Sequence, residues 1–175
     1  MLESFAEILA VGGKSNSLGR TNEVIERVLD DKYRLDELYT CVFNDDAWVR
    51  MRAMDAIEKI CRQHPDWLLP YIDRFQRDLA LSDQPSVQWH LAQIYGQVDL
   101  NAAQKHVAIQ WLKDRLSTTA VDWIVAANAM TTLVQFTNDG SVPKDTTVSL
   151  LELQQTHRSK SVVRKAKKLL LGLMQ

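Results

Sequence analysis

A near-constant interval between four valines is the sequence feature that most constrains the fold. Val49, Val87, Val125 and Val162 are separated by 38, 38 and 37 residues. At four, eight and eleven positions after each valine, every residue is apolar or small. Because an α-helix has 3.6 residues per turn, these offsets share one helix face. Four copies at this interval predict stacked helix pairs, with one pair in each repeat.

The rest of the chain is also helical in pattern. Hydrophobic residues follow helix-face spacing almost throughout, and there are only 6 Gly and 4 Pro in 175 residues. Such a low content disfavours an all-β sandwich or barrel, which needs frequent turns. We therefore predict an all-α protein whose ten helices form the pairs 2–11 with 21–31, 33–43 with 46–63, 67–81 with 85–98, 102–116 with 120–137, and 145–156 with 160–174.

The first copy of the repeat resembles the second helix of a HEAT repeat. Between Asp46 and Ile60 the order is an aspartate, Val-Arg three residues later, small residues and then aliphatic residues. The other copies keep the apolar positions but replace Arg50 by Gln88, Ala126 and Val163. The leader from Ser15 to Asp31 is similar to small bacterial HEAT-like proteins of unassigned chemistry.

The resemblance to the HEAT-repeat, armadillo-like family implies a fold. It is a right-handed α-solenoid of about five stacked antiparallel helix pairs. We expect one domain over residues 1–175. Residues 1–31 would form an atypical N-terminal capping pair, and residues 32–174 would form four repeats.

Charge is unevenly distributed along the chain, although the formal net charge is only −1. Residues 1–46 contain ten acidic and five basic residues, whereas residues 139–175 contain three acidic and seven basic residues. The overall charge gives no reason to expect nucleic acid or an anionic membrane as partner. The basic end is either a solvated helix face or a docking patch for an acidic partner, nucleic acid included; its cations are Arg158, Lys160, Arg164, Lys165, Lys167 and Lys168.

Cysteine usage and the first residues predict a cytoplasmic protein. Cys41 and Cys61 cannot form a disulfide framework, and each lies in an apolar helix, where a small core residue is expected. Residues 1–10 carry Glu3 and Glu7 and no Lys or Arg, whereas a secretory signal begins with a basic segment. No segment has the roughly 20 apolar residues that span a bilayer, so we expect no membrane partner.

Motifs for catalysis, cofactors and metals are weak. Residues 12–15, Gly-Gly-Lys-Ser, suggest a phosphate loop, but Ile8 replaces its required glycine and a helix precedes it instead of a strand. Cys61 and His64 could share a metal, but no further ligands follow at a matching spacing. We therefore expect no cofactor and no metal, and a protein that is not an enzyme.

A candidate binding face follows from the repeat. We expect residues at offsets 2, 3, 6 and 10 from each valine to point away from the buried face, onto the concave side that second helices commonly line. Most are polar, and Trp and Arg are favoured at binding hot spots. With the basic helix at the end of the chain, the candidate residues are Met51, Arg52, Asp55, Lys59, Trp89, His90, Gln93, Asn128, Arg164, Lys165 and Lys168.

Two functions are consistent with this pattern. The first is a non-catalytic scaffold that binds a protein or peptide along the second helices. The alternative is a HEAT-like nucleic-acid-binding protein. Trp48 and Trp123 follow Asp46 and Asp122, and a HEAT-like family of DNA alkylation-repair glycosylases uses Asp and Trp on its concave face. That likeness concerns only fold and residue type, and it transfers no catalytic role. A continuous basic groove would favour the alternative.

Overall fold

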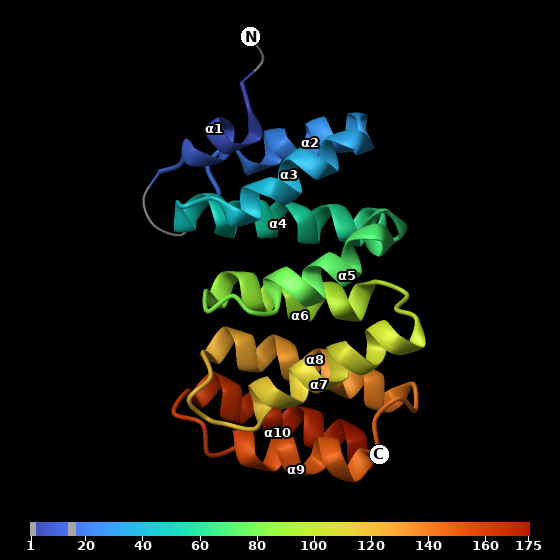
Figure 1. Ribbon diagram of the computed structural model, residues 1–175. Helices are drawn as coiled ribbons and strands as arrows, with labels where there is room; N and C mark the ends of the chain where they lie inside the picture. The colour runs from blue at the N-terminus through green and yellow to red at the C-terminus, as the bar shows by residue number, and fades with distance from the viewer. Residues whose placement is uncertain (1–2, 14–16) are drawn as a thin grey trace. The chain divides into compact units, whose positions relative to one another are not determined.

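Helices form the regular structure of the computed structural model, which describes residues 3–13 and 17–175 (Figure 1). No strand occurs among these residues. The all-α prediction is therefore confirmed for this part of the chain. Contacts divide the chain into two compact units, Met1–Pro70 and Tyr71–Gln175.

In the first unit, the longest helix lies against each of the others. Its elements are α1 (Phe5–Ala10), α2 (Thr21–Asp30), η1 (Lys32–Arg34), α3 (Leu35–Thr40), η2 (Cys41–Phe43), α4 (Ala47–Gln63) and the 3-10 segment that begins at Pro65. Helix α4 packs against α1, α2 and α3. It begins after Asp46, whose carboxylate accepts the Trp48 backbone N–H at 2.8 Å and so caps the helix.

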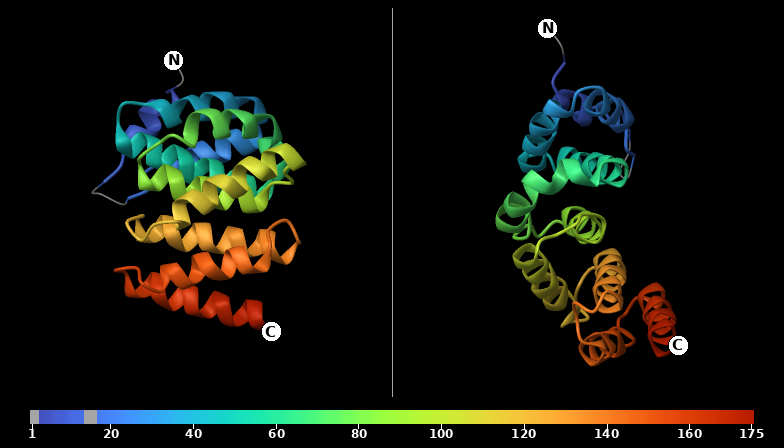
Figure 2. Two further views of the ribbon diagram at one scale, coloured as in Figure 1. Left: turned by 60° about the horizontal axis from the view of Figure 1, so that its bottom comes forward. Right: turned by 90° about the vertical axis from the view of Figure 1, so that its right-hand side faces the viewer.

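In the second unit, helix α8 has the most neighbours. The elements after η3 (Pro65–Tyr71) are α5 (Ile72–Arg74), η4 (Phe75–Leu79), α6 (Pro85–Gln97), α7 (Ala102–Leu116), α8 (Trp123–Asn138), α9 (Lys144–Gln154) and α10 (Lys160–Met174). Helix α8 contacts α6, α7, α9 and α10. The right-hand view of Figure 2 shows α6, α8 and α10 along one side of this unit and α7 and α9 along the other. The unit is thus two layers of helices.

The valine repeat is buried throughout. Val49, Val87, Val125 and Val162 are each at most 1% exposed. The twelve residues at offsets 4, 8 and 11 are also buried, with Leu173 the most exposed at 8%. The prediction that these sixteen positions face the interior is confirmed. Since α6, α8 and α10 are neighbours, three of the four repeats bury this face within one unit.

Two predicted helices are not continuous α-helices: the predicted helix 33–43 forms η1, α3 and η2, and the predicted helix 67–81 is more strongly interrupted. The pattern predicts a single helix over 67–81, but the chain forms the 3-10 segment η3, the short helix α5 and the π-helical turn η4. Pro70 lies inside η3. Because proline has no N–H and its ring crowds the preceding turn, a regular α-helix does not continue through it. The apolar residues Leu68, Ile72, Phe75 and Leu79 are nevertheless buried as the pattern requires.

Candidate interaction surface

The row of residues at offset 3 is not the exposed surface that the sequence predicts. Arg52 is 2% exposed and His90 is 6% exposed, while Asn128 and Lys165 are half-buried. Each residue turns an α-helix by about 100°, so offset 3 lies only about 60° from the frame valine. This is the flank of the buried face, where a neighbouring helix packs. The prediction that Arg52 and His90 line an open face is therefore wrong.

Arg52 instead donates hydrogen bonds to two backbone carbonyls of the first unit. Its Nη1 donates to the Leu9 carbonyl at 2.7 Å, and its Nε donates to the Ser17 carbonyl at 2.9 Å. Leu9 is near the C-terminal end of α1, where helix carbonyls have no partner within the helix. The buried guanidinium thus satisfies backbone acceptors on both sides of residues 10–16. It is a structural residue.

The glycines around this loop have a packing role. A Cβ atom on Gly12 would overlap the Arg52 guanidinium, so a larger residue there would displace that group from its position. Gly19 has a φ of +52°, and a Cβ atom there would overlap the Val11 carbonyl. These contacts give Gly12 and Gly19 a packing role without a phosphate ligand. Lys14 and Ser15, the other half of the suspected phosphate motif, lie outside the described residues.

Polar residues predicted to face a partner instead link α6 to α8. Gln93 donates to the Asn128 side-chain carbonyl at 3.1 Å, and Asn128 in turn donates to the Ile124 carbonyl at 2.8 Å. Thr132 donates to the Ala92 carbonyl at 2.8 Å within the same interface. Side chains with such partners contribute to helix packing, and binding through them requires those bonds to be exchanged.

The His90 side chain is also buried, and it is hydrogen-bonded to the backbone of its own helix, α6. Its Nδ1 lies 2.6 Å from the Ser86 carbonyl. Because a carbonyl only accepts, Nδ1 carries the proton and donates it. The ring also lies 5.1 Å, between centroids, from the indole of Trp89. His90 is therefore a buried residue that contacts the Trp89 ring.

Three further candidates belong to α4 in the first unit. Met51 is 8% exposed, so the prediction that it points away from the buried face is wrong. The cause is that α1, α2 and α3 all pack against α4 and cover most of its circumference. Asp55 and Lys59 form an ion pair of 2.8 Å between Oδ2 and Nζ, at i and i+4 of the helix.

The side of the second unit's second helices that stays exposed carries tryptophan and cations. Trp123 is 51% exposed, Trp89 is half-buried, and Arg164 and Lys168 are exposed. Offsets 2 and 6, to which Trp89, Arg164 and Lys168 belong, lie nearly opposite the valine frame. When the repeats are aligned on Val87 and Val125, Trp123 on α8 occupies the position that Pro85 occupies on the neighbouring α6. Pro85 lies one helical turn before Trp89. We call Trp89, Gln93, Trp123, Thr131, Arg164 and Lys168 the second-helix face.

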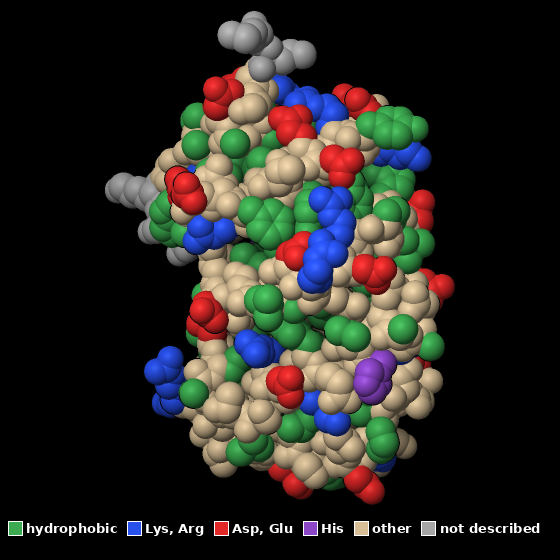
Figure 3. Space-filling view, viewed as in Figure 1, with side chains coloured by type: hydrophobic (Ala, Val, Ile, Leu, Met, Phe, Trp, Pro, Cys, Tyr) green, Lys and Arg blue, Asp and Glu red, His purple; other side chains and the backbone are tan. Residues whose placement is uncertain are grey.

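The side of the second unit that carries α7 and α9 differs in charge from the second-helix face. Figure 3 views the side on which α7 and α9 lie in front, and acidic and basic side chains are interspersed on it. Trp111 of α7 is 8% exposed and its Nε1 donates to the Ala80 carbonyl at 3.1 Å. Trp111 is therefore a packing residue.

The two aspartate–tryptophan pairs have a structural explanation. Asp46 caps α4, and the Asp122 carboxylate accepts the Ile124 backbone N–H at 2.9 Å and caps α8. Aspartate is among the preferred residues at this position because it satisfies N–H groups that lack partners in the first turn. The two aspartates therefore cap helices. In each aspartate–tryptophan pair, the exposed tryptophan is the residue that is available to contact a partner.

Both cysteines are buried thiols. Burial, with a smaller contribution from Glu37, raises the pKa of Cys41 to about 11; burial and the charge of Glu58 raise the pKa of Cys61 to about 12. At pH 8 fewer than about one in a hundred molecules carries either thiolate. We expect no reaction of the folded chain with Ellman's reagent at pH 8 and two reacting thiols in 6 M guanidinium. Rapid labelling of the folded chain would show that one cysteine is accessible.

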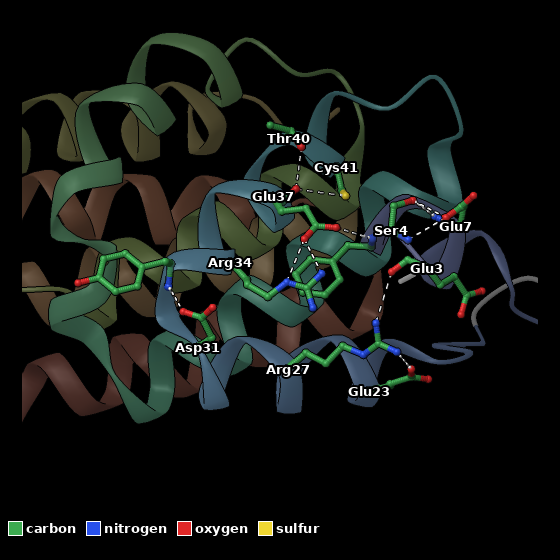
Figure 4. Close-up of polar contacts among 12 residues, drawn as sticks. Glu3, Ser4, Glu7, Glu23, Arg27, Asp31, Arg34, Glu37, Thr40 and Cys41 are labelled. Carbon is green, nitrogen blue, oxygen red and sulfur yellow. Dashed lines mark hydrogen bonds and ion pairs between the residues drawn. The ribbon is translucent and has the colours of Figure 1, made fainter. Parts of the chain in front are cut away.

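A network of charged residues organises the N-terminal unit (Figure 4). The Glu37 carboxylate accepts the Phe5 backbone N–H at 2.8 Å and two bonds from Arg34, at 3.1 and 2.6 Å. The Arg34 guanidinium lies 4.0 Å from the centre of the Phe5 ring. These contacts tie the start of α1 to α3. The network is a structural feature that the sequence pattern did not predict, because its partners are 32 residues apart.

A pocket in the second unit is lined by residues of α6 and α7 and of the loops that precede α6 and α8. Its volume is about 350 Å³, and its lining residues are Asp83, Pro85, Gln88, Asp114, Arg115, Thr118, Ala120, Val121 and Asp122. Among the residues that the structure describes, no group of three His, Cys, Asp or Glu side chains is placed to hold a metal ion. Nor is any helix in that part of the chain long and apolar enough to cross a membrane.

Comparison with known proteins shows only the fold. No family model matches the sequence, and no curated protein matches it significantly. One similar solved structure is the crystal structure of an engineered protein from the Northeast Structural Genomics Consortium, with a TM-score of 0.56. The two sequences are 19% identical, and the match covers 97% of this chain and 71% of that chain. At this identity the likeness concerns the arrangement of helices and carries no function.

Proposed function

We propose that this chain is a HEAT-like α-solenoid that works as a non-catalytic interaction module and binds a peptide segment of a partner protein along the second-helix face. The observation that carries the proposal is the exposure of Trp123, whose side chain is 51% exposed beside the helix that bears Trp89. Tryptophan is enriched at binding hot spots because it offers a large apolar surface with little conformational freedom to lose.

Helix spacing limits the size of the bound segment. Packed helices are about 8–10 Å apart, so α6, α8 and α10 together span about 16–20 Å. An extended chain advances about 3.3 Å per residue, so about five or six residues cross this surface. An apolar side chain of the segment would pack against the two indoles. Acidic side chains would pair with Arg164 and Lys168, which have no ion-pair partner among the described residues.

The repeat supports the solenoid part of the proposal. The interval is 37 or 38 residues, its apolar frame is buried in all four copies, and α6, α8 and α10 contact one another in sequence order. Stacked repeats of this kind bind partners through extended surfaces formed by equivalent helices.

The basic helix α10 favours nucleic acid as the second candidate. Its residues include Lys160, Arg164, Lys165, Lys167 and Lys168 and no acidic residue. Neighbouring α6 and α8 contribute neutral polar side chains to the same face, so the cations do not continue across it. Phosphate binding would show a steep loss of affinity with added salt, whereas contact with tryptophan would persist.

The test uses three matched tryptophan variants. Peptides would be selected from a random 12-residue library on the purified chain, and their affinities measured by fluorescence anisotropy. We expect Trp123→Ala and Trp89→Ala each to weaken binding about 5- to 100-fold, with unchanged helix content. Trp48→Ala is the control, because Trp48 is 41% exposed but lies in the first unit. Equal affinity of all three variants and the parent would overturn the proposed face.

A further inference from the structure

The last helix carries an exposed stripe that is basic in its first turns and apolar in its last. Lys160, Arg164 and Lys168 are exposed at i, i+4 and i+8 of α10. Leu171 and Met174, on the same face, are 64% and 65% exposed. We call these five residues the basic stripe. Large apolar side chains exposed beside a cluster of charge are typical of a contact surface.

The cations of this stripe lack counter-charges. None of them forms an ion pair among the described residues, and α10 contains no acidic residue. Burial, and then the charge of Lys168, lowers the pKa of the neighbouring Lys165. Like charges are therefore close enough to repel, and an acidic surface placed over them would relieve that repulsion.

Beside the basic stripe is a shallow apolar groove. Its volume is about 300 Å³, and it is lined by Gln155, Lys167, Leu170, Leu171 and Met174. Leucine and methionine supply most of its walls. A groove of this size holds one large side chain next to the positive charges.

The first unit presents a complementary stripe on α2. Asn22, Glu26 and Asp30 are exposed at i, i+4 and i+8, and Tyr33 just beyond is 81% exposed. Glu26 and Asp30 form no ion pair among the described residues, unlike Glu23, which pairs with Arg20 and Arg27. We call Glu26, Asp30 and Tyr33 the acidic stripe.

We propose that the basic stripe of one molecule docks on the acidic stripe of a second copy of this chain. Glu26 and Asp30 are one turn apart on α2, as Arg164 and Lys168 are on α10, and Tyr33 lies in η1, just beyond the end of α2. Placed side by side in the same direction, each acid meets a cation, and the Tyr33 ring reaches the apolar groove. Opposite charges at matched spacing fix register, and the aromatic ring supplies apolar contact.

The contact joins two different surfaces, so it is heterologous. In such a pair one copy keeps its acidic stripe free and the other keeps its basic stripe free, so repetition builds a chain of molecules unless it closes into a ring. The basic stripe shares Arg164 and Lys168 with the proposed peptide site, but Trp89 and Trp123 belong to the peptide site alone. Substituting those tryptophans should leave self-association unchanged.

A charge-swap experiment tests the contact. The acidic-stripe variant is Glu26→Lys with Asp30→Lys, and the basic-stripe variant is Arg164→Glu with Lys168→Glu. Sedimentation velocity over a range of concentrations at about 50 mM NaCl should show the parent associating reversibly. Each variant alone should associate at least about fivefold more weakly. An equimolar mixture should associate again, because each stripe of one variant then finds opposite charge on the other.

Control variants distinguish the contribution of the two stripes from the effects of net charge and of loss of folding. Asp45→Lys with Asp99→Lys makes the same change in net charge at exposed positions outside both stripes, and it should associate like the parent. Tyr33→Ala should weaken association without any change of charge. Circular dichroism checks that each variant is folded, and Arg164→Gln with Lys168→Gln replaces the reversal if that variant unfolds. Raising NaCl to about 500 mM, where the Debye length is about 4 Å, should weaken the parent's association.

Several results would overturn the contact. The parent could remain a monomer at every concentration, or association could survive both charge reversals. The mixture could also fail to regain association. If the parent stays monomeric but binds a DNA duplex or vesicles with anionic lipid through Arg164 and Lys168, the basic stripe serves a different partner and the proposal is wrong.

Discussion

Replacing Arg52 by alanine should lower the free energy of unfolding of the first unit by about 2–4 kcal/mol. The substitution removes the donors to the Leu9 and Ser17 carbonyls and leaves a space beside Gly12. A buried acceptor without a partner loses its hydration without compensation. Urea denaturation followed by circular dichroism measures the effect. Arg52→Lys should be intermediate, since one ammonium group cannot reproduce the fork of the guanidinium.

Arg158→Ala is the matched control for this prediction. Arg158 is exposed and has no ion pair among the described residues, so its loss should change stability by less than about 0.5 kcal/mol. A stability loss from Arg52→Ala no larger than that of the control would contradict the structural role. Arg52 would then be better explained as a surface residue.

Replacing Leu91 by alanine should cost about 2–4 kcal/mol in the second unit. Leu91 is fully buried on α6, four residues after Val87, and belongs to the repeated apolar face. The loss has two parts. Fewer apolar atoms are removed from water on folding, and a cavity remains between the packed helices. Thermal and urea unfolding both report it.

Leu81→Ala makes the same chemical change at an exposed site. Leu81 is 81% exposed, so its truncation should leave stability within about 0.5 kcal/mol of the parent. The pair of leucines therefore compares a frame position with a surface position. Similar losses at the two sites would mean that the 38-residue frame does not define the core.

Local patterns predicted the elements and the buried face well. The apolar face of each repeat helix is buried as its spacing predicts, and local signals also mark helix starts: a capping box of Asn101 with Gln104 at α7 and Pro85 at α6. Each depends on residues within a few positions of one another, so one sequence is enough to find it. Helix interruption at Pro70 was missed because the apolar spacing continues across it.

The candidate site was harder to predict, because its residues are defined by neighbours far away in the sequence. Arg52 meets carbonyls 35 and 43 residues away, and Gln93 meets Asn128. A helical wheel identifies the centre of the buried face, but the flanks are covered or open according to which helix packs there. Trp123 lies on the uncovered side and was noted in the sequence only for the aspartate before it.

Hydrogen–deuterium exchange with a selected peptide tests the central claim most directly. The backbone amides of α6 and α8 should exchange more slowly when the peptide is bound, and the slowing should vanish in Trp123→Ala. Amides of α7 and α9, on the other side of the second unit, should not change. Slower exchange confined to α7 and α9, or slowing of α6 and α8 that persists without the Trp123 indole, would contradict binding on the second-helix face.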